Sequence, residues 1–279
     1  MRHQASRKEV SEAEKLSAEI KQIASKAGAN LVGIVLPRAI DDLPKVWVGF
    51  KEIQDHTKKA ADIMRDAKSI IVMGYHIWDN ALELAILRGE RWTYPEYFAL
   101  KALALEVIAY LEKKGNEAII TNSLSYKRLA QLAGFGNYGK NALIVNSEYD
   151  PWMRFAVVLT NAEMKPDEPF EKNLCENCEN CLRACPVGAL VPYKVDYAKC
   201  LVGIHLIDKE NFERNRKWRR FEPSLTKNSH FMCMECQKAC RYGRECVESE
   251  AGLARVVEHS LTKAINASGS RILLHAWNT

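Results

Sequence analysis

The sequence has no long hydrophobic run. No segment approaches the roughly 18 consecutive apolar residues that a membrane-spanning helix needs, so we expect no insertion into a membrane. Residues 1–15 are polar and charged, without a hydrophobic signal segment or a twin-arginine pair. We therefore expect no export and a cytoplasmic location. The net charge of +5 over 279 residues is too small to indicate nucleic-acid binding by itself.

Cysteine is absent from the first 174 residues. All 9 cysteines lie between Cys175 and Cys246, which excludes a framework of disulfides scattered along the chain. Thiols that cluster in a protein of a reducing compartment are more often metal ligands than disulfide partners. Low-complexity tracts are also absent, and the internal repeat is a pair of cysteine motifs.

The first cysteine motif runs from Cys175 to Pro186. Its spacing, C-x2-C-x2-C-x3-C-P, is that of bacterial [4Fe–4S] ferredoxins, and a second, incomplete motif begins at Cys233. In ferredoxins with two clusters, three close cysteines bind one cluster and the cysteine before proline binds the other. The sequence thus predicts two ligand sets: Cys175, Cys178, Cys181 and Cys240 for the first cluster, and Cys185, Cys233, Cys236 and one further residue for the second.

The missing ligand of the second cluster has two candidates. A regular motif would have a cysteine three residues before Cys233, where His230 stands instead. We favour Cys200, because histidine is an uncommon ligand of this cluster type and Cys200 has no other evident role. Cys246 is then left as a free thiol or a substitute ligand.

Two other interpretations of the cysteines stay open. Paired CxxC motifs also bind zinc, although three cysteines at this spacing before Cys-Pro are unlike a zinc ribbon. A module that has lost one cluster is the second interpretation, because Arg241 replaces the proline expected after Cys240.

The part of the chain before residue 164 alternates helical and strand patterns. Ser11-x-x-Glu14 is a capping box that begins a helix towards Ala27, where Gly28 suits the helix end. Short apolar runs predict strands at 31–36, 69–74, 118–121, 142–146 and 155–160, and residues 94–114 predict a long helix. This alternation predicts an α/β layer architecture for residues 1–163.

Residues 164–279 differ in character. A proline- and acid-rich linker at 164–169 leads into the cysteine motifs, and residues 248–265 predict a closing helix. Such a module needs little apolar core, because metal–ligand bonds supply folding free energy. We therefore predict an α/β cofactor-binding domain at 1–163 and a ferredoxin-like double-cluster domain at 164–279.

A glycine-rich loop precedes this second part, with the sequence AGFGNYGKN at residues 133–141. Glycines let the backbone approach a ligand closely, but the spacing fits neither a P-loop nor a dinucleotide-binding motif. By itself the loop predicts either a binding loop or a tight turn between a helix and a strand.

Together, the loop and the cysteines resemble the superfamily of epoxyqueuosine reductases and reductive dehalogenases. Residues 29–34 and 68–75 look like its first two strands, and Cys200 looks like its additional cluster ligand. The resemblance implies a nitroreductase-like α/β domain that binds cobalamin beside a bacterial ferredoxin-like module with two clusters. The residues that it implies for the corrinoid pocket are Gly134, Gly136, Asn137, Tyr138, Gly139, Lys140 and Asn141.

The function that the resemblance implies is that of an iron–sulfur oxidoreductase. Its two clusters would relay electrons from reduced ferredoxin or flavodoxin to cobalt, which reduces a small or nucleoside-type substrate. The alternatives are an electron-transfer or corrinoid-handling protein without catalysis, and a variant that uses flavin instead.

The sequence departs from the epoxyqueuosine reductases where their aspartate acid lies in a V-D-x-x-P-like segment. Residues 119–124 read IITNSL here, with no carboxylate and no proline. The family's segment with tyrosine, aspartate and histidine is replaced by Tyr-Pro-Glu-Tyr at 94–97. The chain ends at Thr279, so we expect no helical-repeat extension for tRNA, and a small-molecule substrate is favoured over tRNA.

The proton donor must therefore be sought elsewhere. Reduction at carbon needs a donor within hydrogen-bond reach, and we predict Tyr126 or Tyr75 as the catalytic residue, with His76 and Tyr138 as further candidates. A cation such as Lys127 can lower a tyrosine pKa. The alternative for each tyrosine is a structural, half-buried side chain.

A basic cluster with two aromatic residues lies at 214–221, with the sequence RNRKWRRF. It fits a solvated face, a docking patch for an acidic electron donor, or an RNA contact through stacking and phosphate binding.

Overall fold

The structure of the chain is a computed structural model that describes residues 11–44, 47–48, 55–77, 79–88, 91–149, 151–202 and 228–242. Three sequence predictions lie outside these residues: the basic cluster at 214–221, the closing helix at 248–265, and Cys246. Within the described part, no helix is both long enough and apolar enough to cross a membrane.

The first part of the chain is built on a four-stranded sheet. Its strands are β1 (Leu31–Val35), β4 (Ser69–His76), β10 (Met153–Thr160) and β7 (Ala118–Ile120), in the order β1-β4-β10-β7. Every neighbouring pair is antiparallel. The four corresponding strand predictions are thus confirmed. The strand predicted at 142–146 is shorter, β9 (Ile144–Val145), and pairs with β8 (Asn137–Tyr138) outside this sheet.

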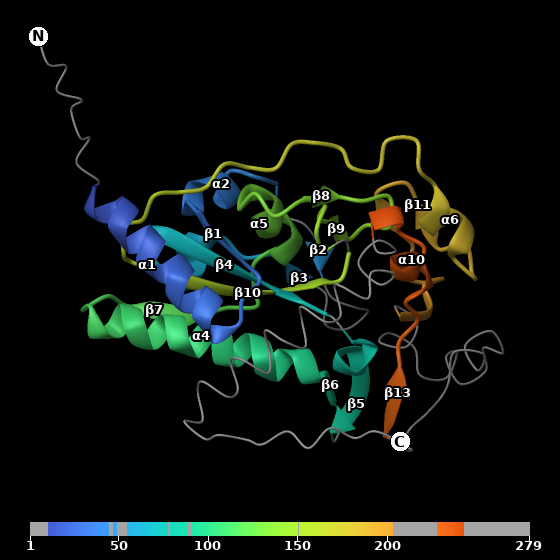
Figure 1. The fold of residues 1–279 in the computed structure, drawn as a ribbon, viewed down its shortest axis with the longest axis horizontal. Helices are drawn as coiled ribbons and strands as arrows, with labels where there is room; N and C mark the ends of the chain where they lie inside the picture. The colour runs from blue at the N-terminus through green and yellow to red at the C-terminus, as the bar shows by residue number, and fades with distance from the viewer. Residues whose placement is uncertain are drawn as a thin grey trace, which may run out of the picture.

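Helices cover both faces of the sheet, as Figure 1 shows. On one face, α1 (Glu12–Ala27) and α4 (Pro95–Lys113) pack against the side chains of Met73 and Val158. On the other face, α2 (Pro37–Asp41), α3 (Ala60–Ile63) and α5 (Tyr126–Leu132) pack against Val72 and Val157. Because successive side chains of a strand point to opposite faces, the central strands need apolar residues at nearly every position. The predicted α/β layer architecture is confirmed.

Helix α1 begins and ends as its sequence predicts. The Glu14 backbone N–H donates to Ser11 Oγ over 3.2 Å, and the Ser11 N–H donates to Glu14 Oε2 over 3.0 Å. Gly28 follows the last residue with a φ of 116°, a left-handed conformation that favours glycine.

Shorter elements complete the described fold. They are β2 (Trp47–Val48), β3 (Asp55–His56), the 3-10 helix η1 (Asn80–Glu83), β5 (Leu84–Arg88), β6 (Arg91–Thr93), α6 (Asn180–Ala184), β11 (Leu190–Val191), β12 (Lys194–Val195), β13 (Ser229–Phe231) and α10 (Glu235–Lys238).

Strand β13 ties the cysteine-rich part to the first part of the chain. It pairs with β5, and β5 pairs with β6, in a three-stranded antiparallel sheet. The backbone of His230 lies opposite Ala85 in this register. The second cysteine motif therefore starts from a strand that the α/β part holds.

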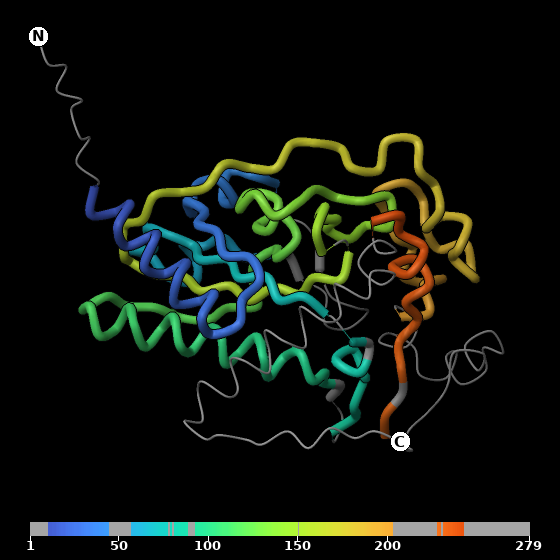
Figure 2. The backbone as a smooth tube through the Cα atoms, viewed as in Figure 1, coloured from blue at the N-terminus to red at the C-terminus, as the bar shows by residue number. Residues whose placement is uncertain are grey.

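Residues 164–173 form a strap along the α/β part, visible in Figure 2 as the long yellow segment. The Ile34 N–H donates to Asp167 Oδ2 over 2.8 Å, and the Asp167 N–H donates to the Ile34 carbonyl over 2.9 Å. Lys21 pairs with the same carboxylate, and the Phe170 N–H donates to the Gln131 carbonyl over 2.9 Å. The predicted linker thus connects the two parts, but hydrogen bonds fix its course.

Two leucines of helix α4 test this packing. Leu111 has no exposed surface, whereas Leu105 is 50% exposed. We expect Leu111→Ala to lower the free energy of unfolding by about 2–5 kcal/mol, because it leaves a cavity in the core. Leu105→Ala, the matched control, should change it by only about 0.5 kcal/mol. Chemical denaturation measures both, and equal losses would contradict the packing described for α4.

Candidate iron–sulfur site

A first group of thiols lines an open hollow beside α6. Asn141, Val145, Leu174, Arg241 and Tyr242 complete its lining, and the thiols are those of Cys175, Cys178, Cys181 and Cys240. Within the described residues, no three His, Cys, Asp or Glu side chains converge on one point as ligands of a single metal ion do. The four thiols line the wall of a space instead.

The local backbone explains how the first motif turns its thiols to one side. The Cys178 N–H donates to the Cys175 carbonyl over 2.8 Å, which closes a tight turn, and Glu176 has a φ of 43° within it. Helix α6 then carries Cys181, which is buried. Helix α10 packs beside α6 and ends just before Cys240, which brings this cysteine back to the first motif.

The thiols predicted for the second cluster, here called the second thiol group, are Cys185, Cys200, Cys233 and Cys236, and electrostatic effects connect them. Burial raises the pKa of the Cys236 thiol to about 12, and the nearby Cys233, Cys200, Cys181 and Cys185 raise it further in the same direction. Burial also raises the pKa of Cys233, with Cys200 and Cys185 among its neighbours. Cys200 raises the pKa of both Cys233 and Cys236, so it lies within electrostatic range of the second motif. Without a metal, ionised thiols at this site would be costly.

His230 was the other candidate for the fourth ligand of the second cluster. Its backbone lies in β13, but its side chain is outside the described part of the structure. Cys200 is held by a hydrogen bond from its N–H to the Asp196 carbonyl, over 2.9 Å. The structure thus brings Cys200 to Cys233 and Cys236, and the choice of Cys200 over His230 as ligand stays a prediction.

Arg241 stands where a ferredoxin has proline, and it joins the two cysteine motifs. Its guanidinium donates to the Leu174 carbonyl over 2.8 Å and lies 3.4 Å from the Glu176 carboxylate. It also lines the hollow of the first thiol group. A cation beside this hollow favours negatively charged thiolates and clusters.

The glycine-rich loop lies against the first thiol group. The Lys140 N–H donates to Cys175 Sγ over 3.4 Å, and Asn141 lines the hollow. A Cβ atom on Gly139 would lie 3.5 Å from Cys175 Sγ and 2.5 Å from Val145 Cγ2. The structure therefore places this end of the predicted corrinoid loop beside the cysteines.

The other end of the loop is the turn from α5 to β8. Gly134 has a φ of 80°, and a Cβ atom there would meet the Glu168 carbonyl of the strap at 2.8 Å. A Cβ atom on Gly136 would collide with the Val145 carbonyl. Asn137 Nδ2 donates to the Glu171 carbonyl over 3.2 Å, and Tyr138 is half-buried. The space that these glycines leave is filled by the chain itself.

A buried polar cluster lies at the start of helix α4. Glu96 is 2% exposed and Glu83 is 5% exposed, and Arg154 forms an ion pair with Glu83. Burial, followed by the charge of Glu83, raises the pKa of the Glu96 carboxyl to about 7, and Arg154 offsets part of this rise. Within the described part of the structure, Glu96 Oε2 is buried without a hydrogen-bond partner. Burial also raises the pKa values of Tyr94 and Tyr97.

Sequence reasoning missed Glu96 as a site residue. The one available signal was that residues 94–97 keep a carboxylate where the related families have an acidic segment. Its burial and its neighbours come from three elements, η1, α4 and β10, that are far apart along the chain.

The two tyrosines predicted as catalytic lie near this polar cluster. Tyr126 donates its hydroxyl hydrogen to the Thr121 carbonyl over 2.9 Å, and burial raises its pKa to about 12. Tyr75 lies opposite Arg154 in the register of β4 and β10. Lys127 Nζ donates to the Ala142 carbonyl over 2.7 Å. A catalytic role for either tyrosine stays a prediction.

Lys127 connects the polar cluster with the second thiol group. Burial lowers the pKa of its ammonium group, the charge of Arg154 lowers it further, and Cys236 acts in the opposite direction. Both Arg154 and Cys236 thus lie within electrostatic range of Lys127. The second thiol group and the buried carboxyls are neighbouring parts of one region.

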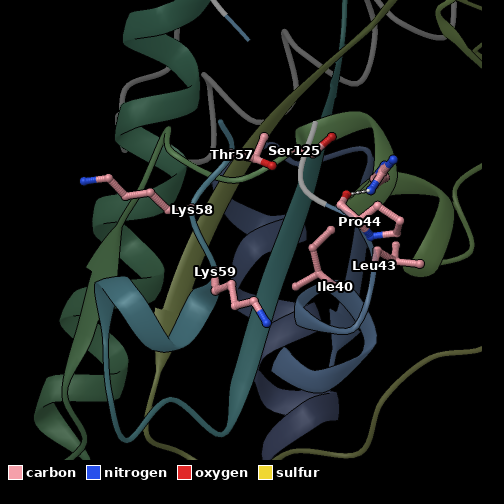
Figure 3. A pocket seen from close by; sticks show the side chains of 8 residues that line it. Ile40, Leu43, Pro44, Thr57, Lys58, Lys59 and Ser125 are labelled. Carbon is pink, nitrogen blue, oxygen red and sulfur yellow. Dashed lines mark hydrogen bonds between the residues drawn. The ribbon is translucent and has the colours of Figure 1, made fainter. Parts of the chain in front are cut away.

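A separate hollow of ≈ 270 Å³ lies on the other side of the sheet, between α2 and α5. Figure 3 shows its lining, which is Ile40, Leu43, Pro44, Thr57, Lys58, Lys59, Ser125 and Arg128. The Arg128 guanidinium donates to the Pro44 carbonyl over 2.6 Å, so one of its N–H groups forms a hydrogen bond within the fold.

Residues 174–243 match the family model described as a "4Fe-4S double cluster binding domain". An epoxyqueuosine reductase of Listeria monocytogenes is 34% identical over 44% of this chain and 31% of its own length. That of Cyclobacterium marinum is 24% identical over 83% of this chain and 80% of its own length.

Solved structures give the same relationship. An epoxyqueuosine reductase determined with a tRNA-Tyr stem loop has a TM-score of 0.62 at 22% identity, over 82% of this chain and 66% of that one. A reductive dehalogenase has a TM-score of 0.58 at 18% identity, over 92% of this chain and 35% of that one. At these identities the likeness is one of fold.

The chain is thus similar in sequence to epoxyqueuosine reductases, and in fold to epoxyqueuosine reductases and reductive dehalogenases. The predicted combination of a nitroreductase-like α/β domain with a ferredoxin-like double-cluster module is confirmed. The match with the Listeria monocytogenes relative spans about a third of that protein, 31% of its length.

Replacing Glu96 tests its unusual environment. The pKa of the Glu96 carboxyl is about 7 in the folded protein, above the ordinary value of 4.5. The protonated carboxyl therefore contributes its full stabilisation of the fold below about pH 4.5, and this stabilisation is lost as the pH rises through 7. We expect Glu96→Gln to stabilise the protein by roughly 2–3 kcal/mol at pH 8 and little at pH 5.

Thermal unfolding midpoints at both pH values, measured anaerobically, check this expectation. Glu106→Gln, an exposed position on the same helix, is the matched control and should show no such pH dependence. Equal midpoints of wild type and Glu96→Gln at pH 8 would show that the fold does not raise the pKa of Glu96.

Proposed function

We propose that this chain is an iron–sulfur reductase in which two [4Fe–4S] clusters pass electrons, one at a time, towards a reducible substrate. The observation that carries the proposal is the arrangement of the thiols. Cys240 of the second motif joins the first thiol group, and Cys185 of the first motif joins the second group. This exchange of one cysteine between motifs is what a two-cluster ferredoxin module requires.

The ligand sets that we propose follow these two groups. Cys175, Cys178, Cys181 and Cys240 hold the first cluster, and Cys185, Cys200, Cys233 and Cys236 hold the second. The donor set fits, since thiolates are the usual ligands of [4Fe–4S] clusters. Backbone N–H groups of Lys140 and Ala189 donate to Cys175 and Cys185 sulfur over 3.4 and 3.2 Å. Such hydrogen bonds offset the negative charge of a thiolate-bound cluster and raise its potential.

We further propose cobalamin as the electron acceptor that serves the substrate. The support is the superfamily, including a dehalogenase whose structure is described in terms of B12-dependent dehalogenation. A bound corrinoid supplies a cobalt centre that accepts electrons one at a time. The loop residues from Gly134 to Asn141 remain the proposed contact region, although its glycines make room for the chain's own atoms in this fold.

The substrate that we propose is a small or nucleoside-type molecule, with reduced ferredoxin or flavodoxin as the electron donor. The names of the relatives support reduction of an epoxide carried by a modified nucleoside. One of them was determined with an epoxyqueuosine-modified tRNA stem loop, which makes that stem loop the first macromolecular substrate to assay.

Iron analysis of single cysteine variants tests the ligand sets. We expect about eight irons per chain in the anaerobically purified wild type, since each cluster holds four. Cys200→Ala should fall to about four irons, because the second cluster loses a ligand. Cys246→Ala, the matched control, should keep the wild-type content. A wild type with about four irons, or full iron content in Cys200→Ala, would contradict the proposed sets.

Reconstitution with hydroxocobalamin tests the electron acceptor. After removal of unbound corrinoid and partial reduction, we expect a bound Co(II) signal in the electron paramagnetic resonance spectrum. Heat-treated protein is the control for adsorbed cobalamin. Loss of all cobalt on gel filtration, with both clusters intact, would exclude the corrinoid and leave a flavin to be tested in the same way.

A further inference from the structure

Resting on the proposed reductase function, we propose that Glu96 is the proton donor of the reaction. It would take the role for which the epoxyqueuosine reductases use an aspartate, from a different element of the fold. Residues 119–124, where that aspartate is expected, contain no acid.

The position of Glu96 suits a group that must meet a substrate. Its carboxyl is 2% exposed, and within the described residues its Oε2 atom is buried without a hydrogen-bond partner. A buried polar atom without a partner costs free energy, and a substrate oxygen would supply the missing partner. Tyr97 and Phe98, which follow directly, are 51% and 63% exposed, so aromatic side chains lie on the surface near the start of α4.

The charges around Glu96 favour its protonated form. Glu83 of η1 and Arg154 of β10 lie near it as an ion pair, and Tyr94, which precedes α4, and Tyr97 of α4 are also near it. Because Arg154 is already paired with Glu83, a second buried carboxylate would be left in excess. The start of α4 favours an anion through the helix dipole, yet burial and the charge of Glu83 outweigh this effect.

Two other donors in this region, Tyr126 and Lys127, are engaged elsewhere. The Tyr126 hydroxyl donates to the Thr121 carbonyl, and Lys127 donates to the Ala142 carbonyl. The pKa of Tyr126, about 12, is far above neutral pH, whereas that of Glu96 is about 7. General acids work best when their pKa lies near the working pH, so Glu96 is the better donor.

The proposed step balances as follows for an epoxide substrate. Two electrons, supplied one at a time by a reduced one-electron donor through the clusters, enter as both carbon–oxygen bonds of the ring break. Glu96 gives a proton to the leaving oxygen, and solvent gives a second. An alkene and water result, and Glu96 is reprotonated from solvent.

Activity of the anaerobic, reconstituted full chain tests the role. The probes are the epoxyqueuosine nucleoside and an epoxyqueuosine-modified tRNA stem loop, with dithionite as reductant. We expect Glu96→Gln to lower kcat by about 100-fold or more, with unchanged iron content and cluster reduction. Glu106→Gln, exposed on the same helix, should behave like the wild type. A Glu96→Gln enzyme with wild-type kcat would overturn the proposal while leaving the reductase function intact.

The pH profile separates proton donation from a structural role. Because the donor must be protonated, kcat of the wild type should fall as the pH rises through about 7. Glu83→Gln removes the charge that raises the pKa of Glu96, so this fall should move to lower pH. An unchanged profile in Glu83→Gln would count against Glu96 as the titrating acid.

Infrared difference spectroscopy gives a readout without turnover. The wild type should show a protonated carboxyl band at pH 6 that Glu96→Gln lacks and Glu106→Gln keeps. Absence of this band overturns the proposal even in an active enzyme. A wild type that reduces neither probe overturns the reductase function, and the proton-donor role with it.

Discussion

The cysteines of two separate segments must interleave, and much of the described structure serves this constraint. Cys240 of the second motif lines the hollow together with cysteines of the first motif. Cys185 of the first motif lies within electrostatic range of Cys233 in the second. Strand β13 is paired with β5, so that the second motif starts from a fixed point. Arg241 holds the carbonyl of Leu174 next to the first motif. The strap anchors the approach to Cys175 from the other side. Backbone pairing and ionic contacts thus bring the thiols together around the hollow.

The charge distribution links the thiols to the α/β part. Thiolates bring negative charge into a partly buried region, and N–H groups and cations offset it at several points. Lys127 lies within electrostatic range of both Cys236 and Arg154. Arg154 in turn pairs with Glu83, beside Glu96. Two half-buried cations, Lys127 and Arg154, thus lie between the second thiol group and the carboxyls near the start of α4.

Features that depend only on residues close together in the sequence could be predicted from local sequence patterns. The capping box at Ser11 and the strand at 69–74 were predicted because spacing alone determines them. The exchange of one cysteine between the two motifs was predicted from the cysteine spacing, and the two ligand sets stay a prediction. The raised pKa of Glu96 could not be predicted from the sequence, because it depends on burial and on the charges of Glu83 and Arg154, which belong to distant elements. The composition of residues 164–169 predicts a linker, and nothing in it indicates that the Asp167 carboxylate accepts a hydrogen bond from β1.

The interleaved cysteines also bear on how the protein is made. Translation delivers Cys175, Cys178 and Cys181 long before Cys240, the fourth member of the first thiol group. Three cysteines of this group have therefore been synthesised before the ribosome adds the fourth. The second group is completed only when Cys236 emerges. Neither group is complete until the whole α/β part has been synthesised, so the scaffold has the opportunity to fold before either site is assembled.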